Sequence, residues 1–108
     1  MTRYASGRRA EWRARDWLRR RGYTVIRSAG SKGLVDLVAW REPRSIGSTQ
    51  DVIFIQVKYT RRKGEAWVDD NWRTLARMRM PIGVRVCAIV YRHGNTTPEV
   101  RYADEEKS

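Results

Sequence analysis

VDLVAW at residues 35–40 and VIFIQVKY at residues 52–59 are the stretches that determine how this chain folds. Both are rich in β-branched and aromatic residues, which favour extended strands. The second stretch is the more apolar, so we expect it at the centre of a sheet, buried on both faces. Residues 41–51 between them contain Pro, Gly and several Ser, Thr and Gln residues, a composition typical of a hairpin connection.

The rest of the chain completes the pattern of a single α/β domain. Residues 4–21 predict a helix, because four apolar residues recur there at helical spacing: Ala10, Ala14, Trp17 and Leu18. Gly22 is expected to end this helix. A second helix is predicted over residues 66–80, and further strands are predicted over residues 23–28, 84–91 and 99–103.

The predicted order of elements is therefore α-β-β-β-α-β-β, with a mixed central sheet and flanking helices. All 108 residues are expected to belong to one domain, in which residues 103–108 form a frayed polar tail. One cysteine, Cys87, cannot form an internal disulfide and is expected to be a small buried hydrophobe.

The chain is strongly basic, with 23 Lys and Arg residues against 12 Asp and Glu residues and a formal net charge of +11. Arginine dominates, with 19 Arg to 4 Lys, and its planar guanidinium forms bidentate pairs with phosphate. This charge predicts a polyanionic partner, most simply a nucleic acid, although a basic surface can also serve solubility alone. No segment is apolar enough to span a bilayer or to act as a signal peptide, so we expect an intracellular protein that binds no membrane.

Polar residues interrupt the two central strand segments at positions that can meet. Gln56 and Lys58 are two residues apart, so their side chains leave the same face of their strand. A suitable register with the preceding strand brings Asp36 beside them, and Glu11 lies at the inward edge of the first helix. Two carboxylates and an amide oxygen are ligands that suit Mg²⁺ or Mn²⁺.

A structural network of the same residues is the alternative. In that interpretation Lys58 forms a salt bridge with Asp36, and Gln56 hydrogen-bonds to the backbone. Glu11 then forms an exposed helical pair with Arg15. An Asp followed by a Gln-x-Lys is short enough to arise by chance, so spacing alone does not separate the two interpretations.

Asp36 and the strand bearing Gln56-Val57-Lys58 resemble the PD-(D/E)xK nuclease superfamily, whose members have a restriction-endonuclease-like fold. The likeness extends over residues 6–59 to the small Holliday-junction resolvases of archaea and their viruses. It includes Gly7 and Glu11 in a helix, followed by the stretches Gly22-Tyr23 and Gly33-Leu34-Val35-Asp36. The Gln-x-Lys form also resembles Mrr-type restriction nucleases.

The resemblance implies a role for each matching position. Glu11, Asp36 and Gln56 would bind Mg²⁺, for which Mn²⁺ would substitute, and Lys58 would be the catalytic lysine. Arg27 and Ser31 would lie beside the scissile phosphate. Gln56 departs from the resolvases, which usually carry Glu there, so the metal affinity and metal preference of such a site are open.

Basic residues flank the proposed site and are expected to hold DNA phosphates without reading sequence. They are Arg8, Arg9, Arg15, Lys32, Arg61, Arg62 and Lys63. Trp12 and Trp67 are candidates for stacking on an unpaired base, or else for packing. The resemblance further implies a homodimer, since a two-fold axis places two sites on opposite strands of a junction. Five tryptophans in so small a domain fit such an interface.

The sequence thus favours a metal-dependent endonuclease that resolves four-way DNA junctions by paired nicks, in DNA recombination and repair. Two alternatives remain open at this point. One is a restriction or repair nuclease acting on duplex DNA. The other is a non-catalytic nucleic-acid-binding module with the same fold.

Overall fold

The elements follow the predicted order in the computed structural model, which describes residues 3–28, 33–41 and 51–106. The two main helices and five strands are α1 (Arg3–Arg20), β1 (Thr24–Arg27), β2 (Leu37–Arg41), β3 (Asp51–Thr60), α2 (Asp70–Arg77), β4 (Val84–Arg92) and β5 (Glu99–Tyr102). A short helical turn, α3 (Ala103–Glu106), follows β5. The predicted α/β class is therefore confirmed.

One sheet contains all five strands, in the spatial order β1-β2-β3-β4-β5, so β3 lies at its centre as predicted. Neighbours pair antiparallel except β3 and β4, which are parallel. A parallel pair needs a crossover connection, and α2 lies within that connection. The mixed sheet follows from this one crossover among hairpin-type connections.

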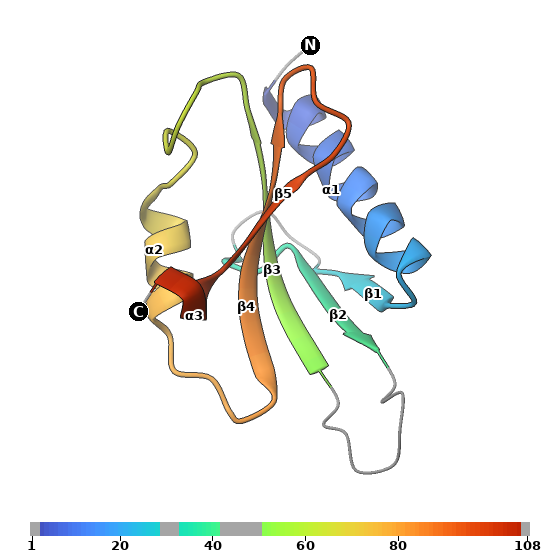
Figure 1. Ribbon diagram of the computed structural model, residues 1–108, viewed down its shortest axis with the longest axis vertical. Coiled ribbons are helices and arrows are strands. Elements are labelled where there is room, and N and C mark those ends of the chain that lie inside the picture. Colours follow the sequence, from blue (N-terminus) through green and yellow to red (C-terminus); the bar gives the residue numbers. More distant parts are fainter. Residues whose placement is uncertain (1–2, 29–32, 42–50, 107–108) are drawn as a thin grey trace.

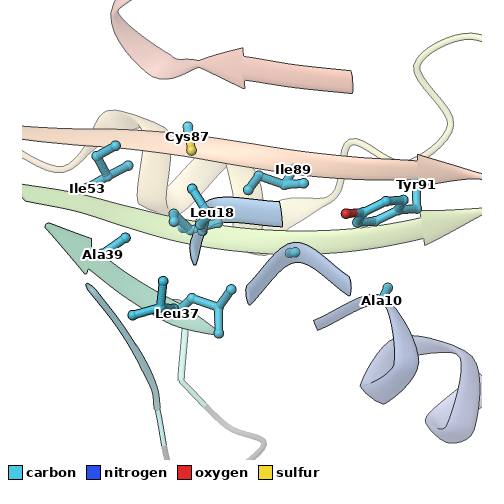
Figure 2. Close-up of a cluster of buried hydrophobic side chains, with 11 residues drawn as sticks. Ala10, Leu18, Leu37, Ala39, Ile53, Cys87, Ile89 and Tyr91 are labelled. Atoms are coloured by element: carbon cyan, nitrogen blue, oxygen red, sulfur yellow. The ribbon is translucent and has the colours of Figure 1, made fainter. Parts of the chain in front are cut away.

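The two faces of the sheet are covered by different helices: α1 lies on one side, and α2 and α3 lie on the other (Figure 1). Strand alternation distributes the side chains of β3 between the two resulting cores. Ile53 and Ile55 pack toward α1, whereas Phe54 packs in the core beneath α2. Figure 2 shows the α1-side core, in which Leu18 from the helix and Ile89 from β4 belong to the same buried cluster.

The end of α1 follows from Gly22, which was predicted to stop the helix. Its φ of +88° lies in the left-handed region that glycine adopts without a Cβ clash. The Gly22 N–H donates to the Arg19 carbonyl at 3.0 Å, and the Tyr23 N–H donates to the Leu18 carbonyl at 3.2 Å. These bonds satisfy carbonyls that the helix end would otherwise leave unpaired.

The second helix is shorter than the predicted 66–80, because α2 spans only Asp70–Arg77. Asp69 caps its start, accepting a hydrogen bond from the Trp72 N–H at 2.9 Å. At the other end Met78 is extended, with φ −66° and ψ 138°. Met80 precedes Pro81, and a residue before proline is disfavoured in the helical conformation.

The chain end also differs from the prediction of a frayed tail over residues 103–108. Ala103 is buried in the core beneath α2, and Asp104 pairs with Arg85 at 3.3 Å, so the tail begins with the ordered turn α3. Within the described part of the chain, no helix is both long and apolar enough to cross a membrane.

Candidate active site

The site residues gather where β2 begins and β3 approaches its end. Leu37 pairs with Ile55 at the start of the β2–β3 ladder, and Asp36, just before β2, is bonded to β3 through the Ile55 carbonyl and the Val57 N–H. Gln56 and Lys58 alternate with Ile55 and Val57, which pack on the α1 side. Their side chains therefore leave β3 on the α2 face, as the spacing predicted.

Asp36 is held by the backbone of the strand beside it. Its Oδ2 accepts a hydrogen bond from the Val57 N–H at 2.8 Å, and its own N–H donates to the Ile55 carbonyl at 2.8 Å. Burial raises the pKa of the Asp36 carboxyl and outweighs the opposing Val57 hydrogen bond. The negative charge of Glu11 raises this pKa further, whereas Lys58 and Arg27 lower it.

Gln56 is buried, with 3% of its surface exposed, although its side chain carries a polar amide. Its Nε2 donates to the Leu34 carbonyl at 3.0 Å, which fixes the orientation of the amide. Its Oε1 is buried and has no hydrogen-bond partner among the described residues. Leaving such an acceptor unpaired costs about 1–3 kcal/mol, so the position favours a ligand that the oxygen can bind.

Lys58 forms an ion pair with Asp69, an acid that the sequence analysis did not assign to the site. Burial raises the pKa of Asp69, but the hydrogen bonds from Lys58 and from the backbone N–H groups of Trp72 and Asn71 outweigh it, so the pKa is below its ordinary value. Asp69 therefore stays ionised and holds the Lys58 ammonium at the start of α2. The sequence predicted a helix from residue 66, which placed Asp69 inside the helix. In the structure Asp69 is the N-cap of α2, and from there its carboxylate pairs with Lys58.

Glu11 lies on α1, on the opposite face of the sheet from Lys58. Its Oε2 accepts a hydrogen bond from the Arg27 Nε at 2.9 Å. Both side chains act electrostatically on Asp36, as the opposite effects of their charges on its pKa indicate. Three of the predicted site residues, Glu11, Arg27 and Lys58, thus act electrostatically on a fourth, Asp36.

The alternative structural network is correct in one part and wrong in two. Gln56 does hydrogen-bond to the backbone. Lys58, however, pairs with Asp69 rather than Asp36. Glu11 pairs with Arg27 rather than Arg15, because Arg27 on β1 lies across from it, whereas Arg15 pairs with its neighbour Asp16 at 3.3 Å.

The donor set fits a divalent cation at Asp36 and Gln56. Gln56 Oε1 has no partner among the described residues, and the Asp36 carboxylate, bonded to the N–H of the next residue, Val57, is an oxygen ligand of the kind that Mg²⁺ and Mn²⁺ prefer. Within the described residues there is no cluster of three or more His, Cys, Asp or Glu side chains that could hold a metal. The set therefore rests on one or two carboxylates and one amide oxygen, and most ligands of a bound ion would be waters or substrate oxygens.

A groove of about 760 Å³ opens beside Lys58. Gly7 of α1 lies on one side of it, and Trp67 and Asp69 lie on the other. Arg61 and Arg62 line the groove directly after β3, so two of the predicted phosphate-binding residues are next to Lys58. The groove is open to solvent and positive along this edge, properties that suit a polyanionic chain.

The other predicted DNA contacts are less uniformly placed. Arg9 lies near the groove, in a second cavity described below, and Lys63 is exposed in the loop after β3. Arg8 approaches the Trp12 ring, with 5.7 Å between its guanidinium carbon and the ring centre. Ser31 and Lys32 lie outside the described residues.

The two tryptophans proposed for base stacking differ. Trp67 is 5% exposed, packs against Trp72 in the core beneath α2 and is unavailable to a base, so that assignment is wrong. It anchors the chain between β3 and α2, a packing role that the sequence did not distinguish from stacking. Trp12 is 47% exposed on α1 and stays available.

Comparison of the chain with protein-family models and with curated proteins finds no match.

Proposed function

We propose that this protein is a metal-dependent, structure-selective DNA endonuclease that resolves four-way junctions by paired nicks. One observation carries the proposal: the unpartnered Oε1 of buried Gln56, on the strand whose next residue, Val57, binds the Asp36 carboxyl, and two residues before Lys58. A purely structural amide would satisfy both of its polar ends. The resemblance of these positions to the PD-(D/E)xK nucleases supports the same interpretation.

The proposed chemistry is hydrolysis of a phosphodiester: water adds to phosphorus, and one P–O bond to a sugar breaks. Bound at Asp36 and Gln56, Mg²⁺ or Mn²⁺ would neutralise phosphate charge and lower the pKa of a water. Lys58 donates hydrogen bonds to the phosphate oxygens as negative charge accumulates on them. Asp69 keeps the ammonium in place, since its second oxygen is fixed by the Trp72 N–H.

The positive groove accounts for affinity without sequence selectivity. Arg61 and Arg62 border Lys58, and contacts from arginine to phosphate position a strand but read no base. A partner whose shape is distinctive, such as a four-way junction, suits this kind of surface. The enzyme would therefore select its DNA by branching.

We further propose a homodimer, because paired nicks on opposite strands need two sites related by a two-fold axis. Four large apolar side chains are exposed on the described surface and are candidates for such an interface: Trp12, Ile26, Met78 and Ile82. Sedimentation with junction DNA at micromolar protein is expected to show two protomers per junction. A monomer under these conditions would refute the dimer.

The test of the function is incubation with a synthetic four-way junction and Mg²⁺ or Mn²⁺, beside a linear duplex of the same sequence. Wild type is expected to give paired nicks in the junction alone, and Asp36→Asn is expected to bind the junction without cutting it. Equal cutting of the linear duplex would instead indicate the restriction or repair nuclease.

A non-catalytic nucleic-acid-binding module is the second candidate, favoured by the ion pairs that already engage both Glu11 and Lys58. In that case wild type and Asp36→Asn would both bind junctions, and both would leave them intact with either metal. The same assay therefore separates all three functions.

A further inference from the structure

A second cavity, of about 300 Å³, lies on the α1 side of the sheet where β3 and β4 end. Its lining comes from three places in the chain that fold together: Arg9, Ala10 and Arg13 of α1, Tyr59 and Arg61 at the end of β3, and Arg92, His93 and Gly94 at the end of β4. Four of these eight residues are arginines, and none is acidic. Such a lining attracts an anion.

Two of the four arginines, Arg13 and Arg92, are held in place by hydrogen bonds to the protein and line the cavity. Arg13 donates to the carbonyls of Asn95 and Thr96, both at 3.2 Å, and its guanidinium lies 4.1 Å from the Tyr91 ring centre. Arg92 donates to Glu99 at 2.9 Å and to the Gly64 carbonyl at 2.9 Å. Their positions are therefore set by the fold before any ligand arrives.

The guanidinium charges of the other two arginines are not neutralised by any described acid. Among the described residues, neither Arg9 nor Arg61 has an ion pair or a side-chain hydrogen bond to the protein, and both are exposed. They come from different segments, Arg9 from α1 and Arg61 from the segment after β3, and both line the cavity. Two guanidiniums that line one cavity can together bind one phosphate group.

Tyr59 and His93 supply neutral hydrogen-bonding groups to the same cavity. The Tyr59 hydroxyl and His93 Nδ1 are 2.8 Å apart, and the two rings meet edge to face. This contact fixes the imidazole and leaves its other nitrogen for a ligand. The lining therefore combines fixed polar groups with two unpaired cations, as expected of a phosphate site.

We propose that this cavity binds a backbone phosphate of the nucleic acid strand that is cut at Asp36 and Lys58, a subsite that rests on the proposed function. Tyr59 and Arg61 line both this cavity and the groove beside Lys58, so the two are continuous around the end of β3. A strand lying in the groove extends a neighbouring phosphate into the cavity. The cavity fixes the register of the strand, and the chemistry takes place at the other end of the groove.

The test is junction binding in EDTA, where no cleavage occurs, with the double variant Arg9→Ala, Arg61→Ala. The matched control removes two exposed arginines at the far end of α2, in Arg77→Ala, Arg79→Ala. Each lost phosphate contact reduces the slope of log affinity against log salt by about 1. Because both arginines contact the same phosphate, we expect a slope reduced by about 1 and an affinity reduced at least about tenfold in the double variant, with little change in the control.

A set of junctions, each with one phosphate replaced by a neutral methylphosphonate, then locates the contact. Wild type is expected to lose affinity at one phosphate close to the cut, and the double variant is expected to be insensitive there. Equal losses in the double variant and the control would overturn the subsite and indicate general charge attraction. Normal binding by a wild type that never cuts would refute the nuclease and leave the subsite standing, so the two failures are distinguishable.

Discussion

Replacing Gln56 by Met separates a ligand-binding amide from a structural one. Met matches the length and apolar stem of Gln but removes both polar atoms from a side chain that is 3% exposed. The variant loses the hydrogen bond from Nε2 to the Leu34 carbonyl, worth about 1 kcal/mol. It also removes the unpaired buried Oε1, which returns a similar amount.

These two effects nearly cancel, so Gln56→Met is expected to unfold within about 1 kcal/mol of wild type in metal-free buffer. The entropy of unfolding is about 2.1 cal/mol/K per residue, so for 108 residues 1 kcal/mol shifts Tm by about 4 °C. Mg²⁺ at ten times its dissociation constant would stabilise wild type by about 1.4 kcal/mol, or about 6 °C. The variant is expected to lose most of this metal-dependent shift.

The assay is thermal unfolding with EDTA and with Mg²⁺ or Mn²⁺, without DNA. Thr60→Val is the control, because Thr60 is the other buried polar residue of β3 and its Oγ1 accepts from the Arg62 N–H at 3.0 Å. That control is expected to be less stable by about 1 kcal/mol and to keep the metal shift. A Gln56→Met protein that melts more than about 9 °C lower without metal, or that keeps the full metal shift, would refute the ligand role.

Three further predictions concern other groups. Asp69→Asn and Asp69→Ala both remove the charge beside Lys58, so both are expected to slow junction cleavage equally. Only Asp69→Ala loses the helix cap, so only this variant is expected to lower Tm, by about 4 °C for a loss of about 1 kcal/mol. The raised pKa of Asp36 means that the folded state holds this proton more tightly than the unfolded chain, so its contribution to stability falls as pH rises above the ordinary value of 3.8. Asp36→Asn is therefore expected to be more stable than wild type at pH 7 in EDTA, with the difference vanishing near pH 3 in melts; a variant less stable at pH 7 would contradict this. Burial raises the pKa of Cys87 to about 12, so a thiol reagent at pH 8 is expected to label it only after denaturant unfolds the protein, and rapid labelling of the native protein would argue against its burial.

The sequence was sufficient for the order of the elements because each has a strong local pattern. The apolar run from Val52 to Tyr59 is typical of a buried strand and lies within β3. Gly22 adopts the positive φ that commonly ends a helix, directly after α1. The two ends of α2 were harder to predict from the sequence. Its apolar spacing extends beyond the helix at both ends, whereas the cap at Asp69 sets where α2 begins and the extended Met78 ends it, three residues before Pro81.

The candidate site was predictable in part for a related reason. Strand periodicity placed Gln56 and Lys58 on one face, and the hairpin-type connection brought Asp36 next to β3, where it bonds to Ile55 and Val57. Ion-pair partners come from contacts between distant segments, so the pairs Glu11–Arg27 and Lys58–Asp69 had no local signal. The cavity beside Tyr59 has the same origin, since three separate segments form it.

Single-turnover cleavage of a four-way junction by Lys58→Met decides whether Lys58 acts in phosphodiester hydrolysis. Lys58 contributes no cap and lies at the edge of the groove, so the variant is expected to fold and to bind the junction within about threefold of wild type. Removing a donor that acts on the reacting phosphate is expected to slow cleavage at least about 100-fold. A variant that cuts at the wild-type rate, or a wild type that leaves junctions intact with Mg²⁺ and Mn²⁺, would contradict the account.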